Sequence, residues 1–146
     1  MTSAPEANWA LHPQLARDGV AIGDLALARV LVMNDANYPW LILVPRQPGA
    51  VEIIDLDSDR QSQLMSEAAL LARVLKDVTA CDKLNIAAIG NVVPQLHVHV
   101  VARRRGDAAW PKPVWGAVPA RDYEPAERQR FIDAIRNRLG SAITVS

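Results

Sequence analysis

The chain has 146 residues and a mass of 16.0 kDa, which is the size of a single domain with one hydrophobic core. Half of the residues are apolar and 22% are charged, a balance that excludes collagen-like, low-complexity and disordered chains. Basic and acidic residues both number 16, so the net charge is zero, and we expect neither nucleic acid nor a membrane surface as a partner because the chain lacks a general attracting field.

The N-terminal segment carries no recognisable export or membrane signal. It reads MTSAPEANW, without a basic cluster or an apolar core, and the most apolar run elsewhere, residues 40–44, is far shorter than the ~20 residues that span a bilayer. The single cysteine, Cys81, cannot form an intrachain disulfide. We therefore expect a cytoplasmic protein. The first nineteen residues should form a loosely organised segment that leads into the first strand.

The first regular elements are predicted to be strands. Residues 29–33 and 40–44 are apolar and rich in β-branched side chains, and the six residues between them are turn formers. This pattern indicates two antiparallel strands joined by a short connection. A further short strand at residues 20–22 precedes them.

A long helix is predicted over residues 58–79. Its apolar residues recur at spacings of three and four, which gives one buried stripe. The stripe consists of Leu64, Ala68, Leu71, Leu75 and Val78. Ser58 and Gln61 fit a capping box at the start of this helix.

Two more strands and a helix complete the pattern. Residues 84–89 and 96–101 are strand-like, and the six residues between them are too few for a parallel crossover, so these strands must pair antiparallel. A last helix should begin at Pro125, bury one apolar face and stop at Gly140. Its buried residues should be Phe131, Ile132, Ile135 and Leu139.

The fold class expected from this order is α+β, with one long central helix and a C-terminal helix packed on an antiparallel sheet. No repeat and no linker-like segment divides the chain. We expect one domain over residues 1–146, with a core at about 20–105 and a C-terminal extension at about 106–146.

The polar side chains of the last predicted strand carry the chemistry. Because side chains alternate between the faces of a strand, Leu96, Val98 and Val100 should enter the core. Gln95, His97 and His99 should then form a row on the opposite face. A neutral imidazole can attack phosphorus, and a second imidazole two residues away can supply a proton to the leaving group.

Metal binding is the rival interpretation of a His-x-His strand. A metal site needs further ligands nearby, whereas three arginines, residues 103–105, follow almost at once and would repel a cation. We therefore expect no metal and no other cofactor.

Residues 90–101, which read GNVVPQLHVHVV, resemble the signature of the histidine-triad (HIT) superfamily. The order of strands, helix and strands agrees over about residues 20–105. The downstream motif Trp110-Pro-x-Pro-x-Trp115 is similar to that of bacterial short HIT proteins of the diadenosine polyphosphate hydrolase-like group.

The resemblance implies a homodimeric nucleotide hydrolase or nucleotidyl transferase that acts at the α-phosphorus of a nucleotide conjugate without an obligatory metal. The family's nucleophile falls on His97, and the residue that assists the leaving group falls on His99. Asn91 takes the place of the family's phosphate-contacting glutamine. The residue that contacts the nucleoside falls on Asn34 or Asp35, and the choice between them stays open.

The chain departs from the family pattern in the first triad position, where Gln95 replaces histidine and cannot carry a proton. Val92 also removes a hydroxyl that often contacts phosphate in the family. We expect Gln95 to orient its neighbours, and Arg103 to attract a polyphosphate because a guanidinium favours anions. Two alternatives to an enzyme of this kind are a nucleotide-binding module with little turnover and a metal-dependent His-x-His enzyme.

Overall fold

A computed structural model describes residues 8–145 of the chain, so residues 1–7 and 146 of the predicted domain lie outside it. The sheet has five strands in the spatial order β1-β2-β3-β5-β4, and every neighbouring pair is antiparallel. The strands are β1 (Gly19–Asp24), β2 (Ala28–Met33), β3 (Trp40–Pro45), β4 (Lys83–Ala87) and β5 (Val98–Arg103). The predicted α+β class is confirmed.

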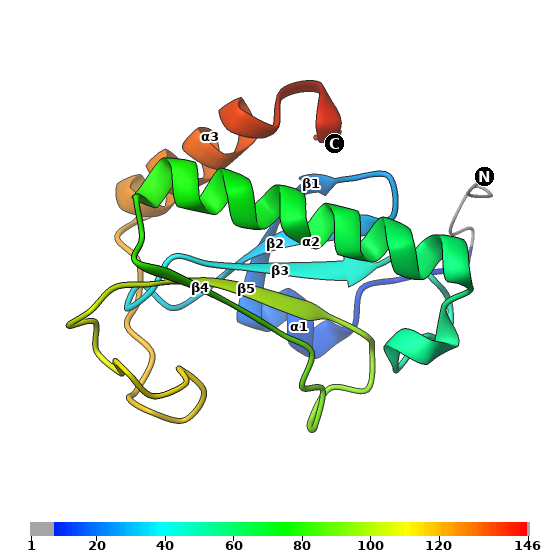
Figure 1. The fold of residues 1–146 in the computed structure, drawn as a ribbon, viewed down its shortest axis with the longest axis horizontal. Coiled ribbons are helices and arrows are strands. Elements are labelled where there is room, and N and C mark those ends of the chain that lie inside the picture. The colour runs from blue at the N-terminus through cyan, green and yellow to red at the C-terminus, as the bar shows by residue number, and fades with distance from the viewer. Residues whose placement is uncertain (1–7, 146) are drawn as a thin grey trace.

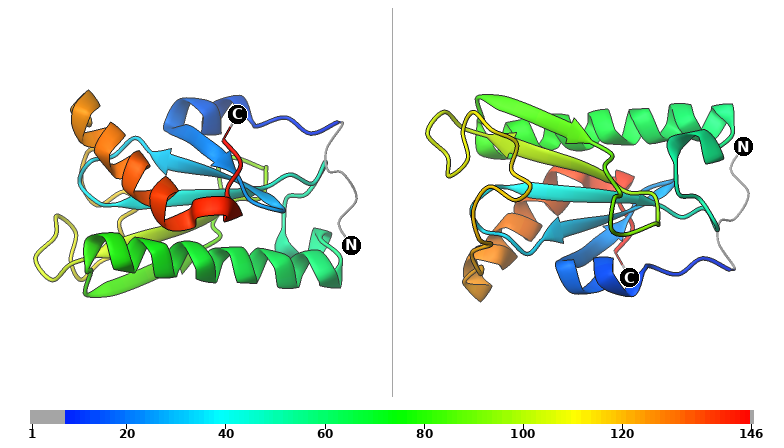
Figure 2. Two further views of the ribbon diagram at one scale, coloured as in Figure 1. Left: turned by 90° about the horizontal axis from the view of Figure 1, so that it is seen from above. Right: turned by 90° about the horizontal axis from the view of Figure 1, so that it is seen from below.

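Helices lie on both faces of this sheet (Figures 1 and 2). The two long helices, α2 (Ser58–Thr79) and α3 (Pro125–Leu139), cover one face, and the short α1 (Pro13–Asp18) lies on the other. Two single 3₁₀ turns, η1 (Ile53–Asp55) and η2 (Gly140–Ala142), complete the regular structure. We call the face with α1 the open face of the sheet.

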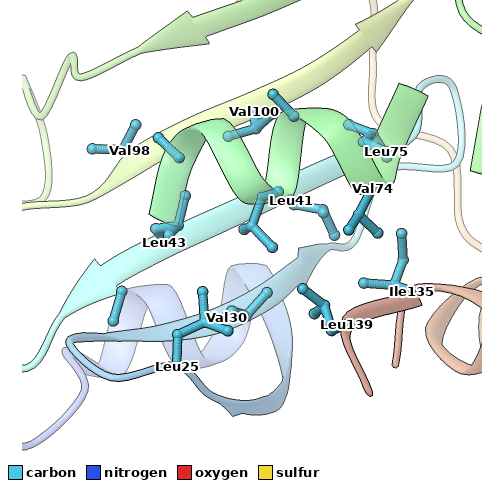
Figure 3. Close-up of a cluster of buried hydrophobic side chains, with 14 of the residues drawn as sticks. Leu25, Val30, Leu41, Leu43, Val74, Leu75, Val98, Val100, Ile135 and Leu139 are labelled. Carbon is cyan, nitrogen blue, oxygen red and sulfur yellow. The ribbon is translucent and has the colours of Figure 1, made fainter. Parts of the chain in front are cut away.

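The strand alternation separates two apolar clusters. Leu41 and Leu43 of β3 and Val98 and Val100 of β5 pack beneath α2 and α3, together with Leu75 of α2 (Figure 3). The other parity of the same strands supplies a second cluster on the open face. The second cluster includes Leu15, Tyr38, Trp40, Ile42, Val93, Val101 and Val114. The predicted inward position of Leu96, Val98 and Val100 is confirmed.

The long helices form where the sequence predicts them, with two local differences. α2 covers the predicted residues, but its N-cap is Asp57, whose side chain accepts a hydrogen bond from the Arg60 N–H at 2.8 Å. The Ser58 capping box is therefore wrong by one residue, because an aspartate offers the same cap one position earlier. α3 begins at Pro125 and ends before Gly140 as predicted, although Phe131 is half-buried.

Two further differences concern the segments around the histidines. β5 begins at Val98 instead of residue 96, because the Leu96 N–H donates to the Ala50 carbonyl at 3.0 Å and leaves the ladder. The segment that leads into the first strand contains a helix that the sequence did not predict, α1, which His12 caps by accepting from the Gln14 N–H at 3.0 Å. Both differences change how the open face is built.

A buried carboxylate joins α2 to the sheet. Glu67 is only 3% exposed, and its two oxygens accept hydrogen bonds from the Leu27 and Ala28 N–H groups at 2.8 and 2.9 Å. The Gln63 amide donates a third bond at 2.7 Å. Hydrogen bonds to a charged acceptor are stronger than neutral ones, and buried donors left without a partner are costly.

We predict that Glu67→Ala lowers the free energy of unfolding by about 3 kcal/mol, because two buried backbone donors lose their acceptor. Urea denaturation at neutral pH measures this change. Ser66→Ala is the matched control, since Ser66 is exposed on the same helix and should change stability by less than about 0.5 kcal/mol. Equal effects of the two substitutions would contradict the role given to the carboxylate.

Candidate active site

A pocket of about 310 Å³ opens on the open face, where the end of α1 meets β3, β5 and the loop between β4 and β5. His97 and His99 line this pocket together. Its other walls are Asp18, Met33, Trp40, Ile89, Gly90, Asn91, Val92, Val93 and Trp115. Both histidines are 7% exposed, and their ring centroids lie 5.0 Å apart, so one bound phosphorus can lie near both.

His97 is held in one tautomer by the backbone. Its Nδ1 lies 2.7 Å from the carbonyl oxygen of Gln95. Because a carbonyl oxygen only accepts, Nδ1 must donate its proton to that bond. The lone pair of a neutral His97 ring is then on Nε2, which is the arrangement that a nucleophile needs.

His99 is held in one tautomer by a tryptophan. The indole Nε1–H of Trp40 donates to Nδ1 of His99 at 3.0 Å, in a buried contact between β3 and β5. Because an indole only donates, Nδ1 of His99 is an acceptor and its proton resides on Nε2. Burial, followed by the charge of His97, lowers the pKa of His99 from 6.5 to about 4. His99 is therefore neutral at neutral pH, a state that the Trp40 bond requires.

The lowered pKa predicts an acid-dependent loss of stability. Between pH 6.5 and about 4 the unfolded chain takes up a proton on residue 99 that the folded protein refuses. The contribution of neutral His99 to the free energy of unfolding is fully present above pH 6.5. It decreases by on the order of 3 kcal/mol as the pH falls toward 4. We expect the difference in unfolding free energy between wild type and His99→Gln to narrow by this amount. Parallel pH profiles for the two proteins would show that the ring is not held neutral.

The loop between β4 and β5 places an amide at the pocket. Gly90 has φ of +63°, a left-handed conformation that disfavours side chains other than glycine. The turn places Asn91 and Val92 in the pocket wall, and both are exposed to solvent. The predicted phosphate contact Asn91 therefore lies in the same pocket as the two histidines, where its amide has donors for a phosphate oxygen.

Gln95 is oriented differently from the histidines. Its side-chain oxygen accepts from the His12 N–H at 2.8 Å, and its side-chain nitrogen donates to the Ala10 carbonyl at 2.9 Å. The predicted row of three polar side chains is thus reduced to two, because the chain turns before β5 begins. Gln95 acts on the pocket from outside, through its carbonyl on His97 and through its amide on residues 10–12.

The predicted nucleoside contacts, Asn34 and Asp35, do not line this pocket. The Asn34 side chain bonds the Arg17 carbonyl and the Arg128 guanidinium, both at 3.2 Å. The Asp35 carboxylate accepts from the N–H groups of Asn37 and Arg121 at 2.9 and 3.2 Å. Both side chains instead join the β2–β3 connection to neighbouring segments, including the C-terminal extension.

Arg103 is not brought to the pocket either. It is 1% exposed, and Asp107 accepts two of its hydrogen bonds, at 2.8 and 3.0 Å. A third goes to the Asn85 side chain at 2.9 Å. Burial alone would raise the pKa of Asp107, but bonds from Arg103 and two backbone N–H groups hold that pKa below its usual value. Arg103 thus fixes the segment after β5 and is not among the residues that line the histidine pocket.

Sequence reasoning missed the pocket residues Asp18 and Trp40, and it named Trp115 only as part of the downstream motif. Trp115 stacks edge to face on His99 and Trp40, with centroid distances of 5.2 and 5.8 Å. A buried indole N–H usually pairs with an acceptor. Trp40 has the parity that puts it on the face of His99 once β3 is known to pair with β5. That pairing was the missing information. Asp18, which closes α1, has no comparable signal in the sequence.

Comparison with known proteins agrees with this geometry. The family model described as HIT domain matches residues 15–106 of the chain. The chain belongs to the HIT domain family. Proteins of this family are generally nucleotide hydrolases or transferases and bind nucleotide substrates.

Three solved HIT structures are similar to this chain over nearly their whole length. A histidine triad protein from Bradyrhizobium japonicum is 59% identical with a TM-score of 0.89, covering 90% of this chain and 98% of its own. One from Sinorhizobium meliloti is 44% identical with a TM-score of 0.88 and the same coverage. One from Marinobacter aquaeolei is 40% identical with a TM-score of 0.88, covering 92% and 98%. None of the curated proteins compared with the chain matches it.

Residues 8–145 lack two further features. No helix among them is both long and apolar enough to cross a membrane. In the same range, no three histidine, cysteine, aspartate or glutamate side chains converge as a metal-ligand group.

Proposed function

We propose that this HIT protein cleaves nucleotide conjugates at the α-phosphorus through a nucleotidyl intermediate on His97. The observation that carries the proposal is the fixed pair of tautomers in the pocket. The Gln95 carbonyl holds the proton of His97 on Nδ1, and Trp40 holds that of His99 on Nε2. One ring therefore presents a lone pair and the other a donor, as attack on phosphorus requires.

The first chemical step forms a bond between Nε2 of His97 and the α-phosphorus and breaks the bond from that phosphorus to the leaving group. The His97 ring becomes positively charged, and its Nδ1–H remains bonded to the Gln95 carbonyl. The Asn91 amide lies in the pocket wall and can donate to a non-bridging oxygen. Water then attacks the same phosphorus and gives up one proton to the solvent. The bond between phosphorus and Nε2 breaks with its electron pair returning to the ring, which releases the nucleoside monophosphate and restores neutral His97.

His99 favours one class of leaving group. With a pKa of about 4 it is neutral and donates a hydrogen bond from Nε2 without delivering a full proton. An amine must be protonated to leave, whereas a phosphate or polyphosphate leaves as an anion that a hydrogen bond stabilises. We therefore propose nucleoside polyphosphate conjugates, such as dinucleoside polyphosphates, ahead of phosphoramidates as substrates.

No metal or other cofactor enters this proposal. The Nδ1 atoms of both histidines are engaged, one as a donor to a carbonyl and the other as an acceptor from an indole. The Nε2 atom of His99 carries a proton in this arrangement, so a metal ion would have to displace it. Activity should therefore persist in the presence of excess chelator.

The intermediate can be trapped because a phosphorus–imidazole nitrogen bond survives alkaline quenching. We predict that wild-type protein, mixed with diadenosine triphosphate and quenched at high pH, gains the mass of one adenylyl group, which is adenosine monophosphate less one water. His97→Ala should lose both the adduct and turnover, by more than a thousandfold. Intact-mass measurement and nucleotide release assays report the two quantities.

His12→Asn is the matched control for this substitution, because asparagine retains a helix cap at α1. It should keep the adduct. Turnover in His97→Ala close to wild type would exclude the covalent route. Tight nucleotide binding without turnover in the wild type would favour the nucleotide-binding module instead.

The edge strand β4 supports a proposed homodimer. In the described part of the sheet β4 pairs only with β5, so its outer edge is open. Three exposed apolar side chains line one hollow together with β4 residues. Ile53 is 43%, Met65 66% and Ile86 48% exposed. Unpaired, apolar strand edges pair readily with other strands, and β4 can pair with its own copy across a two-fold axis. We therefore propose a second copy of this chain as the partner at β4.

We predict that Ile86→Lys converts a dimer into a monomer, because two charged side chains would face each other near the axis. Sedimentation velocity measures the change in mass. Val118→Lys, at an exposed position of the C-terminal extension, should leave the dimer intact. A wild-type protein that stays monomeric at high micromolar concentration would refute the dimer.

A further inference from the structure

A second hollow adjoins the candidate active site at Trp115. It measures about 540 Å³ and is built from residues 108–117, which follow β5. Trp110, Lys112 and Trp115 are its large or charged side chains, among alanine, glycine and proline. Trp115 also lines the pocket of the two histidines, with its ring 5.2 Å from that of His99. One indole therefore borders both spaces.

The volumes of the two spaces indicate that each can hold a different part of a substrate. Sites for small molecules commonly enclose about 300–1,000 Å³, so the histidine pocket, at about 310 Å³, has room for one nucleotide. A conjugate with two nucleosides must place the second one elsewhere. The hollow beside Trp115 is the larger of the two spaces and shares that indole as a wall with the histidine pocket.

The aromatic wall of the hollow is held in place before any ligand arrives. The Arg103 guanidinium lies 5.5 Å from the ring centroid of Trp110, and Asp107 fixes that guanidinium with two hydrogen bonds. Trp110 is half-buried and also lines the hollow. A supported indole is a stacking platform for a planar heterocycle, and the exposed Lys112 supplies a positive charge for phosphates.

We propose that this hollow is the leaving-group site, which takes the second nucleoside of a dinucleoside polyphosphate. Its base stacks on Trp110, and Lys112 contacts the bridging phosphates. The inference rests on the proposed function and extends it, because it places the second nucleoside in a space that the two histidines do not line.

The test compares two substrates that differ only in the second nucleoside, diadenosine triphosphate and ATP. Trp110→Ala should lower kcat/KM about tenfold for diadenosine triphosphate and less than twofold for ATP. Trp110→Phe, which keeps a ring, should recover most of the loss. Trp9→Ala is the matched control, since Trp9 is also half-buried, packs on an arginine, Arg29, and lines neither space.

Equal losses for the two substrates, or no loss for either, would overturn the leaving-group site. If the wild type hydrolyses neither compound, the proposed function fails. The role of the hollow is then tested by measuring the binding of both compounds by equilibrium dialysis. Trp110→Ala must then weaken binding of diadenosine triphosphate about tenfold while leaving ATP binding within twofold. Any smaller difference between the two ligands rejects the hollow independently of catalysis.

Discussion

The strict alternation of β5 between two neighbouring strands is the constraint on which the site depends. β3 and β5 are paired so that Ile42 lies opposite His99 and Leu43 opposite Val98. One parity of β5 is hydrocarbon beneath α2 and α3, and the other carries His99 onto the open face. Shifting the register by one residue would exchange these faces and bury imidazole against leucine. The apolar core therefore determines where the imidazole of His99 points.

Two hydrogen bonds then give nearly equivalent rings different chemical properties. His97 and His99 are the same type of residue in the same alternating motif, so the sequence alone does not assign them different chemical roles. A carbonyl acceptor on one Nδ1 and the Trp40 donor on the other place the protons at opposite positions of the two rings. Burial of His99 keeps that asymmetry at neutral pH, because a protonated ring could not accept from the indole. The different proton positions of the two rings are thus determined by the groups that hydrogen-bond to them, the Gln95 carbonyl and the Trp40 indole.

Local patterns were predictable from the sequence, and contacts between distant segments were not. The limits of α2 follow from helical periodicity, and only its cap was misassigned, because Asp57 and Ser58 offer equivalent oxygens one residue apart. The inward parity of β5 was also predictable. By contrast, Gln95 bonds a backbone group 83 residues away, and the Trp40 contact depends on strand order in the sheet. The resemblance placed a nucleoside contact on Asn34 or Asp35, and that contact stays a prediction. The hydrogen bond between Asn34 and Arg128 of α3 could not be foreseen, because no local pattern reveals where α3 lies.

The Glu67 carboxylate has a mechanical consequence for this architecture. Apolar contacts between a helix and a sheet are non-directional, so α2 could in principle slide by one turn, about 5.4 Å, and still bury leucines. Its bonds to two adjacent backbone N–H groups allow only one axial position. The chain that leaves α2 continues directly into β4 and the histidine loop. Glu67, on the far side of the sheet from the pocket, therefore determines where β4 begins. The position of β4 in turn determines where the loop that leads to the histidines begins.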